Sequence, residues 1–104
     1  MADFTVRVQL DEEDDYGELH DAMALAGFTR TIIAMSGTTY DLPWAEYNLV
    51  GSARTARQVA DEVYRLAAGL NPEPMVFVTQ SVRRTWRGLK PSAPPTLRNR
   101  PNGR

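Results

Sequence analysis

The chain contains no cysteine and only one histidine, His20. Without thiols it can form neither disulfides nor thiolate metal sites, and it has no cysteine nucleophile. A single imidazole also excludes metal sites built from several histidines. No apolar run approaches the ~18 residues needed to cross a bilayer, and no segment has the pattern of a signal peptide. These absences predict a cytoplasmic protein with no membrane partner.

Acidic and basic residues are divided unevenly between the two halves of the chain. Residues 1–50 contain ten acidic and two basic residues, whereas residues 51–104 contain ten basic and three acidic ones. From residue 82 to residue 104 there are seven basic residues and no acidic one. This division favours an anionic partner or an acidic surface of a second copy of the chain. Mutual neutralisation of the two halves after folding is the alternative interpretation.

Hydrophobic periodicity predicts the order strand, helix, strand, strand, helix, strand. Asp15 is the predicted N-cap of the first helix, and Gly27 is its predicted C-terminal stop. Thr55 and Gln58 have the spacing of a capping box at the start of the second helix, which Gly69 ends. The predicted strands cover residues 4–10, 29–35, 38–50 and 75–82, and the predicted helices cover residues 16–26 and 56–67. Pro43 is expected to split the third strand, whose regular part is residues 46–50.

This order predicts an α+β fold: a ferredoxin-like βαββαβ sandwich, with an antiparallel four-stranded sheet and two helices on one face. Residues 1–90 are expected to form the domain, and the proline- and arginine-rich residues 91–104 a disordered basic tail. Residues 75–82 are apolar on both faces, which predicts a strand inside the sheet. The free face of such a sheet suits RNA or a second protomer, and architecture alone does not choose between them.

Asp11 opens an acidic cluster at the junction of the first strand and the first helix. Carboxylates at such a junction can serve Mg²⁺, so Asp11 is the candidate metal ligand and a candidate catalytic residue. The cluster is not an EF-hand, because Tyr16 and Ala22 stand where that loop requires glycine and glutamate. The alternative interpretation is a solvated acidic helix start, which the helix dipole favours. Mg²⁺ is the one cofactor that this acidic cluster suggests.

His20 is the second candidate catalytic residue. It is the only side chain whose ordinary pKa suits acid–base chemistry near neutral pH. Cleavage of RNA by attack of a 2′-hydroxyl needs a base and an acid, and no second partner for His20 stands at a diagnostic spacing. The alternative is a partly exposed helix residue that is hydrogen-bonded to a nearby carboxylate.

The segment after the last predicted strand combines basic and aromatic side chains. Guanidinium groups bind phosphates and stack on bases, and an indole offers a further stacking surface, so this pattern favours single-stranded nucleic acid. The alternative is that the indole closes the edge of the core while the arginines solvate the end of the strand. The candidate nucleic-acid-binding residues are Arg83, Arg84, Trp86, Arg87 and Lys90.

A family resemblance spans about residues 3–90. It is carried by FTVRVQL at residues 4–10, YGELHDAM at 16–23, YDLPWAEYN at 40–48 and TQSVRRTWRGL at 79–89. These segments resemble the GhoS family of small bacterial proteins, the antitoxins of type V toxin–antitoxin pairs. The resemblance implies a ferredoxin-like fold, akin to the small nuclease of CRISPR adaptation complexes, and an endoribonuclease that cleaves the messenger RNA of a small membrane toxin. Asp11 occupies the place of the metal-associated aspartate in those nucleases.

Two functions therefore remain open. The first is an antitoxin-type endoribonuclease whose partner is single-stranded RNA. The second is a non-catalytic module that interacts with proteins or nucleic acid, of a kind that a mobile element can carry. Its free sheet face would bind another protein or a second copy of the chain. Binding of RNA without cleavage would distinguish the second function from the first.

Overall fold

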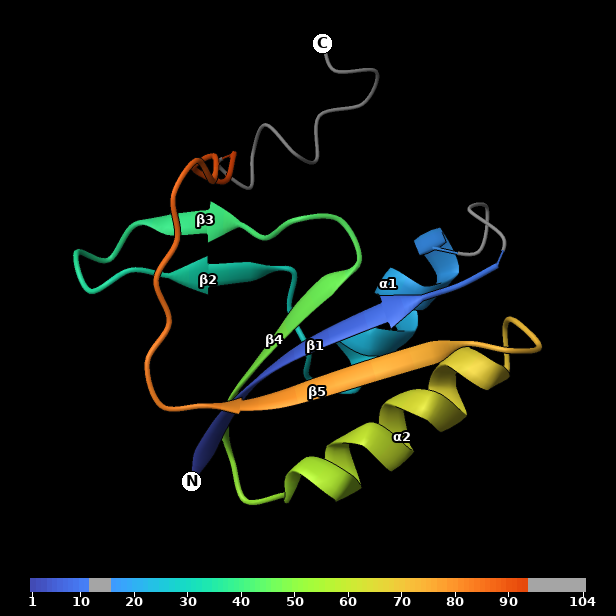
Figure 1. Ribbon diagram of the computed structural model, residues 1–104. Helices are drawn as coiled ribbons and strands as arrows, with labels where there is room; N and C mark the ends of the chain where they lie inside the picture. Colours follow the sequence, from blue (N-terminus) through green and yellow to red (C-terminus); the bar gives the residue numbers. More distant parts are fainter. Residues whose placement is uncertain (12–15, 94–104) are drawn as a thin grey trace, which may run out of the picture.

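Five strands and two helices make up the described part of the chain, which is residues 1–11 and 16–93 of the computed structural model (Figure 1). The predicted N-cap at Asp15 and residues 94–104 of the predicted tail lie outside this part. No helix within it has the length and apolar character needed to span a membrane. The elements are β1 (Ala2–Gln9), α1 (Tyr16–Leu25), β2 (Thr31–Ile33), β3 (Thr39–Asp41), β4 (Glu46–Ser52), α2 (Ala56–Ala68) and β5 (Met75–Ser81).

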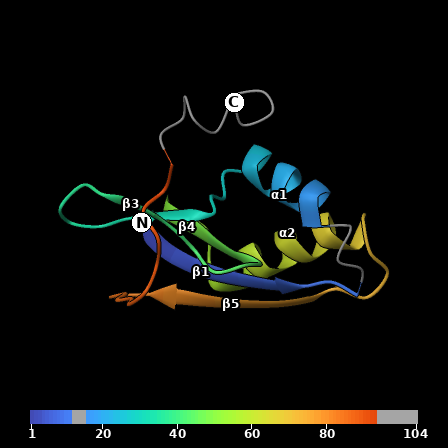
Figure 2. The ribbon, with the colours of Figure 1, turned by 90° about the horizontal axis from the view of Figure 1, so that it is seen from above.

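The strands form two antiparallel sheets. β1 is the central strand of a three-stranded sheet with the order β4-β1-β5, and β2 pairs with β3 in a separate hairpin. Both helices lie on the same side of the three-stranded sheet (Figure 2). The α+β class with antiparallel pairing is confirmed. The strands are divided three and two, however, whereas the sequence predicted one four-stranded sheet.

The hairpin leaves the main sheet because the segment that leads into β2 pairs with β4 at only one residue, Thr29. Thr29 and Asn48 exchange two backbone hydrogen bonds, of 2.9 and 2.7 Å, and this bridge is isolated. Two residues further on, the Thr31 carbonyl accepts from the Asn48 side-chain amide at 3.1 Å and from the Thr29 hydroxyl at 3.1 Å. Side-chain donors of this kind compete with ladder pairing. The chain then turns away into β2.

β5 lies at the edge of the described sheet and pairs with β1, so the prediction of an interior strand was wrong. Its side chains alternate between two environments, because the helices cover only one face of the sheet. Val76 and Val78 are half-buried against the core, while Met75 and Phe77 on the other face are 59% and 71% exposed. The apolar run of β5 therefore supplies one core face and one open apolar face.

The core lies between the three-stranded sheet and the two helices. Every second side chain of β1 points into it, and Phe4, Val6 and Val8 are fully buried. Burial of a side chain of this size stabilises the fold by about 1.5–3 kcal/mol. The helices contribute apolar residues at three- and four-residue spacing, which are Leu19 and Met23 from α1 and Val59, Val63 and Ala67 from α2.

Local signals set the start of α2 and the end of α1 as predicted. The Gln58 backbone N–H donates to the Thr55 hydroxyl at 3.1 Å, and the Gln58 side chain accepts from the Thr55 N–H at 2.8 Å. This is the predicted capping box of α2. Gly27 follows α1 with a φ of 98°, a conformation that favours glycine and ends the helix.

Candidate nucleic-acid interface

The chain after β5 passes the open side of the sheet and runs along the hairpin (Figure 1). The Asp41 N–H donates to the Lys90 carbonyl at 2.9 Å, and the Ser92 N–H donates to the Thr39 carbonyl at 2.9 Å. Tyr40 and Pro91 form a further β-bridge. These contacts attach the segment to β3, so that it encloses a hollow with the hairpin and the sheet.

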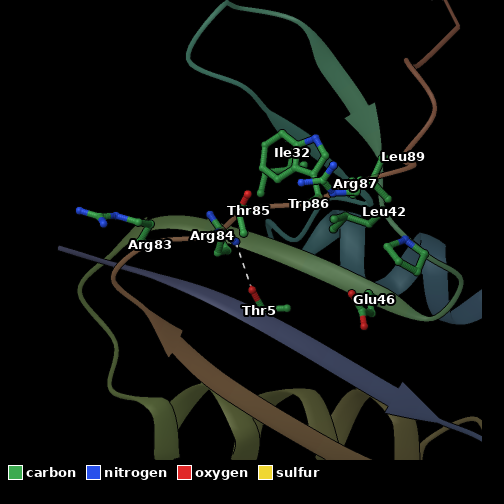
Figure 3. A pocket seen from close by; sticks show the side chains of 11 residues that line it. Thr5, Ile32, Leu42, Glu46, Arg83, Arg84, Thr85, Trp86, Arg87 and Leu89 are labelled. Carbon is green, nitrogen blue, oxygen red and sulfur yellow. Dashed lines mark hydrogen bonds between the residues drawn. The ribbon is translucent and has the colours of Figure 1, made fainter.

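The hollow has a volume of about 470 Å³. Its floor is formed by Thr5 of β1 and Glu46 of β4, and its walls come from the hairpin side and from the segment after β5 (Figure 3). The hairpin side supplies mainly apolar residues, and the segment supplies three arginine residues. The lining residues are Thr5, Ile32, Leu42, Pro43, Glu46, Arg83, Arg84, Thr85, Trp86, Arg87 and Leu89.

Arg84 is committed to contacts within the molecule. Its Nη1 donates to the Asn48 side-chain oxygen at 2.5 Å and to the Thr5 hydroxyl at 3.3 Å, the latter drawn in Figure 3. Its Nη2 lies 3.7 Å from a carboxylate oxygen of Asp3, and the side chain is only 20% exposed. Arg84 was predicted to bind nucleic acid, and the structure places it as the anchor that holds the segment on the sheet.

Trp86 lies at the wall of the hollow in a half-buried position. Its ring packs against Tyr40 of β3, with 5.7 Å between ring centroids and 59° between ring planes. The indole of Trp86 is not part of the main hydrophobic core. Its orientation is fixed by an aromatic neighbour while part of its surface is accessible. A ring held in this way is suited to stack on a planar ligand.

The remaining predicted cations are exposed. Arg83 and Arg87 line the hollow, and Figure 3 shows the Arg83 side chain directed away from it. Lys90 is exposed on the same segment. Glu46 is the carboxylate among the lining residues, and Arg7 lies 3.3 Å from it. Because Arg7 offsets the charge of Glu46, the hollow has a cationic balance that suits a phosphodiester.

Asp11 and His20 do not line this hollow. Asp11 is exposed beyond the end of β1, with its backbone N–H donating to the Asn71 side-chain oxygen at 3.3 Å. It borders a separate hollow of about 400 Å³ that Arg7 and Trp44 also line. Among the described residues, no group of three or more acidic or histidine side chains could hold a metal ion. One described carboxylate does not by itself make a Mg²⁺ site.

His20 is surrounded by aromatic rings. Its Nδ1 is 2.6 Å from the hydroxyl of Tyr47, and the ring of Trp44 meets it edge-on at a centroid distance of 5.1 Å. A tyrosine thus takes the place of the carboxylate partner that the sequence interpretation offered. Nε2 is buried and has no hydrogen-bond partner among the described residues. Within the part of the chain that the structure describes, one ring nitrogen of His20 is thus bonded to Tyr47 and the other is covered.

The electrostatic surroundings of His20 favour its neutral form. Burial is the main cause that lowers the pKa of His20, the nearby Arg30 guanidinium lowers it further, and Asp21 acts in the opposite direction. Burial also raises the pKa of Tyr47 to about 12. The Tyr47 hydroxyl therefore stays protonated beside a neutral imidazole. This pair is an internal polar contact between α1 and β4.

Sequence reasoning did not single out Phe77, the exposed aromatic residue on the open face of β5. Its neighbour across the strands is Arg7 of β1, which is also exposed. The alternation of Met75, Phe77 and Thr79 placed these side chains on one face. It could not show that this face lacks a covering layer.

Comparison with known protein families finds no family model that matches the chain, and comparison with curated proteins finds no match.

Proposed function

We propose that the protein binds single-stranded RNA in the hollow between the β2–β3 hairpin and the segment after β5. The fold is proposed to be a variant of the ferredoxin-like type, in which the segment before β2 pairs with β4 at one bridge only. The protein is then an RNA-binding protein similar to the GhoS-type antitoxins. The observation that carries the proposal is the arrangement of Trp86 between exposed arginines, beside an anchored Arg84.

Each part of the hollow matches one part of a nucleotide. The Trp86 ring, held by Tyr40, can stack on a base, and Arg83 and Arg87 can pair with the flanking phosphates. Stacking tolerates every base, because each has a flat π face. Single strands expose the base faces that such a site needs, whereas a duplex hides them in its stack. The expected ligand is therefore unpaired RNA.

The direct test is a fluorescence anisotropy titration with a labelled eight-nucleotide oligouridine at low salt. The native protein should bind, and the double variant Arg83→Ala with Arg87→Ala should bind at least several-fold more weakly. The matched control is Arg57→Ala with Arg65→Ala, which removes two exposed arginines from α2. Absence of binding by the native protein, or equal losses in both double variants, would overturn the proposal.

Cleavage of the bound RNA is the second candidate activity. The observation that favours it is that Asp11 and Arg7 border one hollow, so a carboxylate and a guanidinium lie at the same surface depression. Native protein and Asp11→Asn should be incubated with RNA in Mg²⁺ and, separately, in chelator. Product that appears with native protein and disappears with Asp11→Asn supports cleavage. Binding without product leaves the non-catalytic function.

A further inference from the structure

We propose that a second hollow, between β1 and β5 on the open face of the sheet, holds one base of the same RNA strand, with Phe77 as the stacking surface. This inference rests on the proposed RNA-binding function and extends it to a site on a different pair of strands. The hollow has a volume of about 260 Å³ and is lined by Arg7, Gln9, Met75, Val76 and Phe77.

The strand register brings the four outward side chains of this hollow together. Arg7 is paired with Phe77, and Gln9 is paired with Met75. Residues two apart on a strand share a face, so all four project to the side opposite the helices. One strand thus supplies a guanidinium and an amide, while the other supplies an aromatic ring and a thioether.

This combination fits a nucleobase better than it fits a purely apolar or purely anionic ligand. Phe77 is 71% exposed and Met75 is 59% exposed, so both present apolar surface to solvent. An aromatic ring at a sheet surface stacks on bases, and guanidinium and amide groups bond to base edges. A phosphate alone would leave Phe77 unused, and an aliphatic chain would leave Gln9 unused.

Arg7 can bind a base in this second hollow although it is paired with Glu46. The two side chains are 3.3 Å apart, but Arg7 is 58% exposed, and an exposed ion pair of this kind is weak. A guanidinium has five N–H donors, of which the contact with Glu46 uses one. With respect to the described residues, the other donors are available to a ligand above Phe77.

The two hollows are adjacent along β1. Thr5 and Glu46 line the hollow that contains Trp86, and Arg7 is both the partner of Glu46 and part of the second hollow. Thr5 and Arg7 are two residues apart, or about 7 Å along the strand. A single strand of RNA can therefore occupy both hollows. A symmetric contact with a second copy would bring equivalent patches bearing Arg7 together, whereas RNA brings opposite charge.

The test compares two probes, labelled oligouridine of eight nucleotides and an abasic ribose-phosphate strand of the same length. Phe77→Ala should weaken binding of oligouridine roughly 10-fold, and Phe77→Tyr should retain it. On the abasic strand, native protein and Phe77→Ala should bind equally, because no base is present to stack. Leu25→Ala is the matched control, since Leu25 is an apolar residue that is 92% exposed at the end of α1.

The outcomes separate this inference from the function on which it rests. If native protein binds oligouridine with dependence on Arg83 and Arg87, but Phe77→Ala binds equally well, this inference fails and the proposed function stands. If native protein does not bind, the proposed function fails. If sedimentation shows a dimer that Phe77→Ala dissociates while oligouridine affinity is unchanged, the face is a protein contact and the inference is overturned.

Discussion

Arg84 and Asn48 are joined by a 2.5 Å hydrogen bond from Nη1 to the side-chain oxygen, which links the segment after β5 to β4. Asn48 is 5% exposed, and its amide nitrogen is bonded to the Thr31 carbonyl of the hairpin. One buried asparagine therefore holds both walls of the hollow. This contact distinguishes Arg84, which fixes the structure, from Arg83 and Arg87, which face solvent.

Replacement of Arg84 is expected to affect stability more than replacement of its neighbour. Arg84→Ala leaves the buried oxygen of Asn48 without this donor, and such a loss costs about 1–3 kcal/mol. Arg83→Ala should be nearly neutral, because Arg83 is exposed. Urea unfolding of both variants measures the difference. Equal unfolding free energies for the two would show that Arg84 is not the anchor.

The two tryptophans should report differently on RNA. Trp86 lines the cationic hollow, whereas Trp44 packs beside His20 and lies 5.3 Å from the Arg30 guanidinium. A base that stacks on an indole quenches its fluorescence, so oligouridine should quench native protein and Trp44→Phe. Trp86→Phe should lose most of that quenching. Quenching that survives in Trp86→Phe and disappears in Trp44→Phe would move the site to the Asp11 hollow.

His20 should make the folded protein less stable in mild acid. Burial lowers its pKa in the folded state, and its value in the unfolded state is about 6.5. The unfolded state therefore takes up the proton more readily. The stability that neutral His20 contributes is complete above the unfolded pKa and is lost as the pH falls through the folded pKa. Unfolding free energies of native protein and His20→Gln should be compared between pH 7 and pH 5.

In that comparison the native protein should lose more stability than His20→Gln, because the carboxylates titrate in both proteins. Asp21 and Arg30 are the charged groups that act on the imidazole, and they are retained in the variant. Parallel pH profiles would mean that the folded protein accommodates imidazolium as easily as imidazole. They would contradict the enclosed position of Nε2 between the aromatic rings.

Features that depend on residues close in sequence were predictable. The capping box of Thr55 and Gln58 spans three residues, and the stop at Gly27 depends on one residue. Alternation along β1 likewise gave the buried face of the central strand. The α+β class follows from these local signals, because they fix the order of helices and strands.

Features that depend on distant partners were not predictable. The anchoring of Arg84 requires Thr5, Asn48 and Asp3, and their contacts form only after the sheet has assembled. For the same reason the sequence could not distinguish Arg84 from Arg83. The edge position of β5 depends on the strand order. The sequence of an apolar strand is the same whether the second face of that strand is covered or open, so its pattern did not reveal the edge position.

The salt dependence of RNA affinity tests the central claim most directly. Each phosphate contact with a single strand contributes about 0.7 to the slope of log affinity against log salt. The double variant Arg83→Ala with Arg87→Ala should therefore lower that slope by roughly 1.4 relative to native protein, while Arg57→Ala with Arg65→Ala leaves it unchanged. An unchanged slope in the first variant would contradict phosphate binding by the segment after β5.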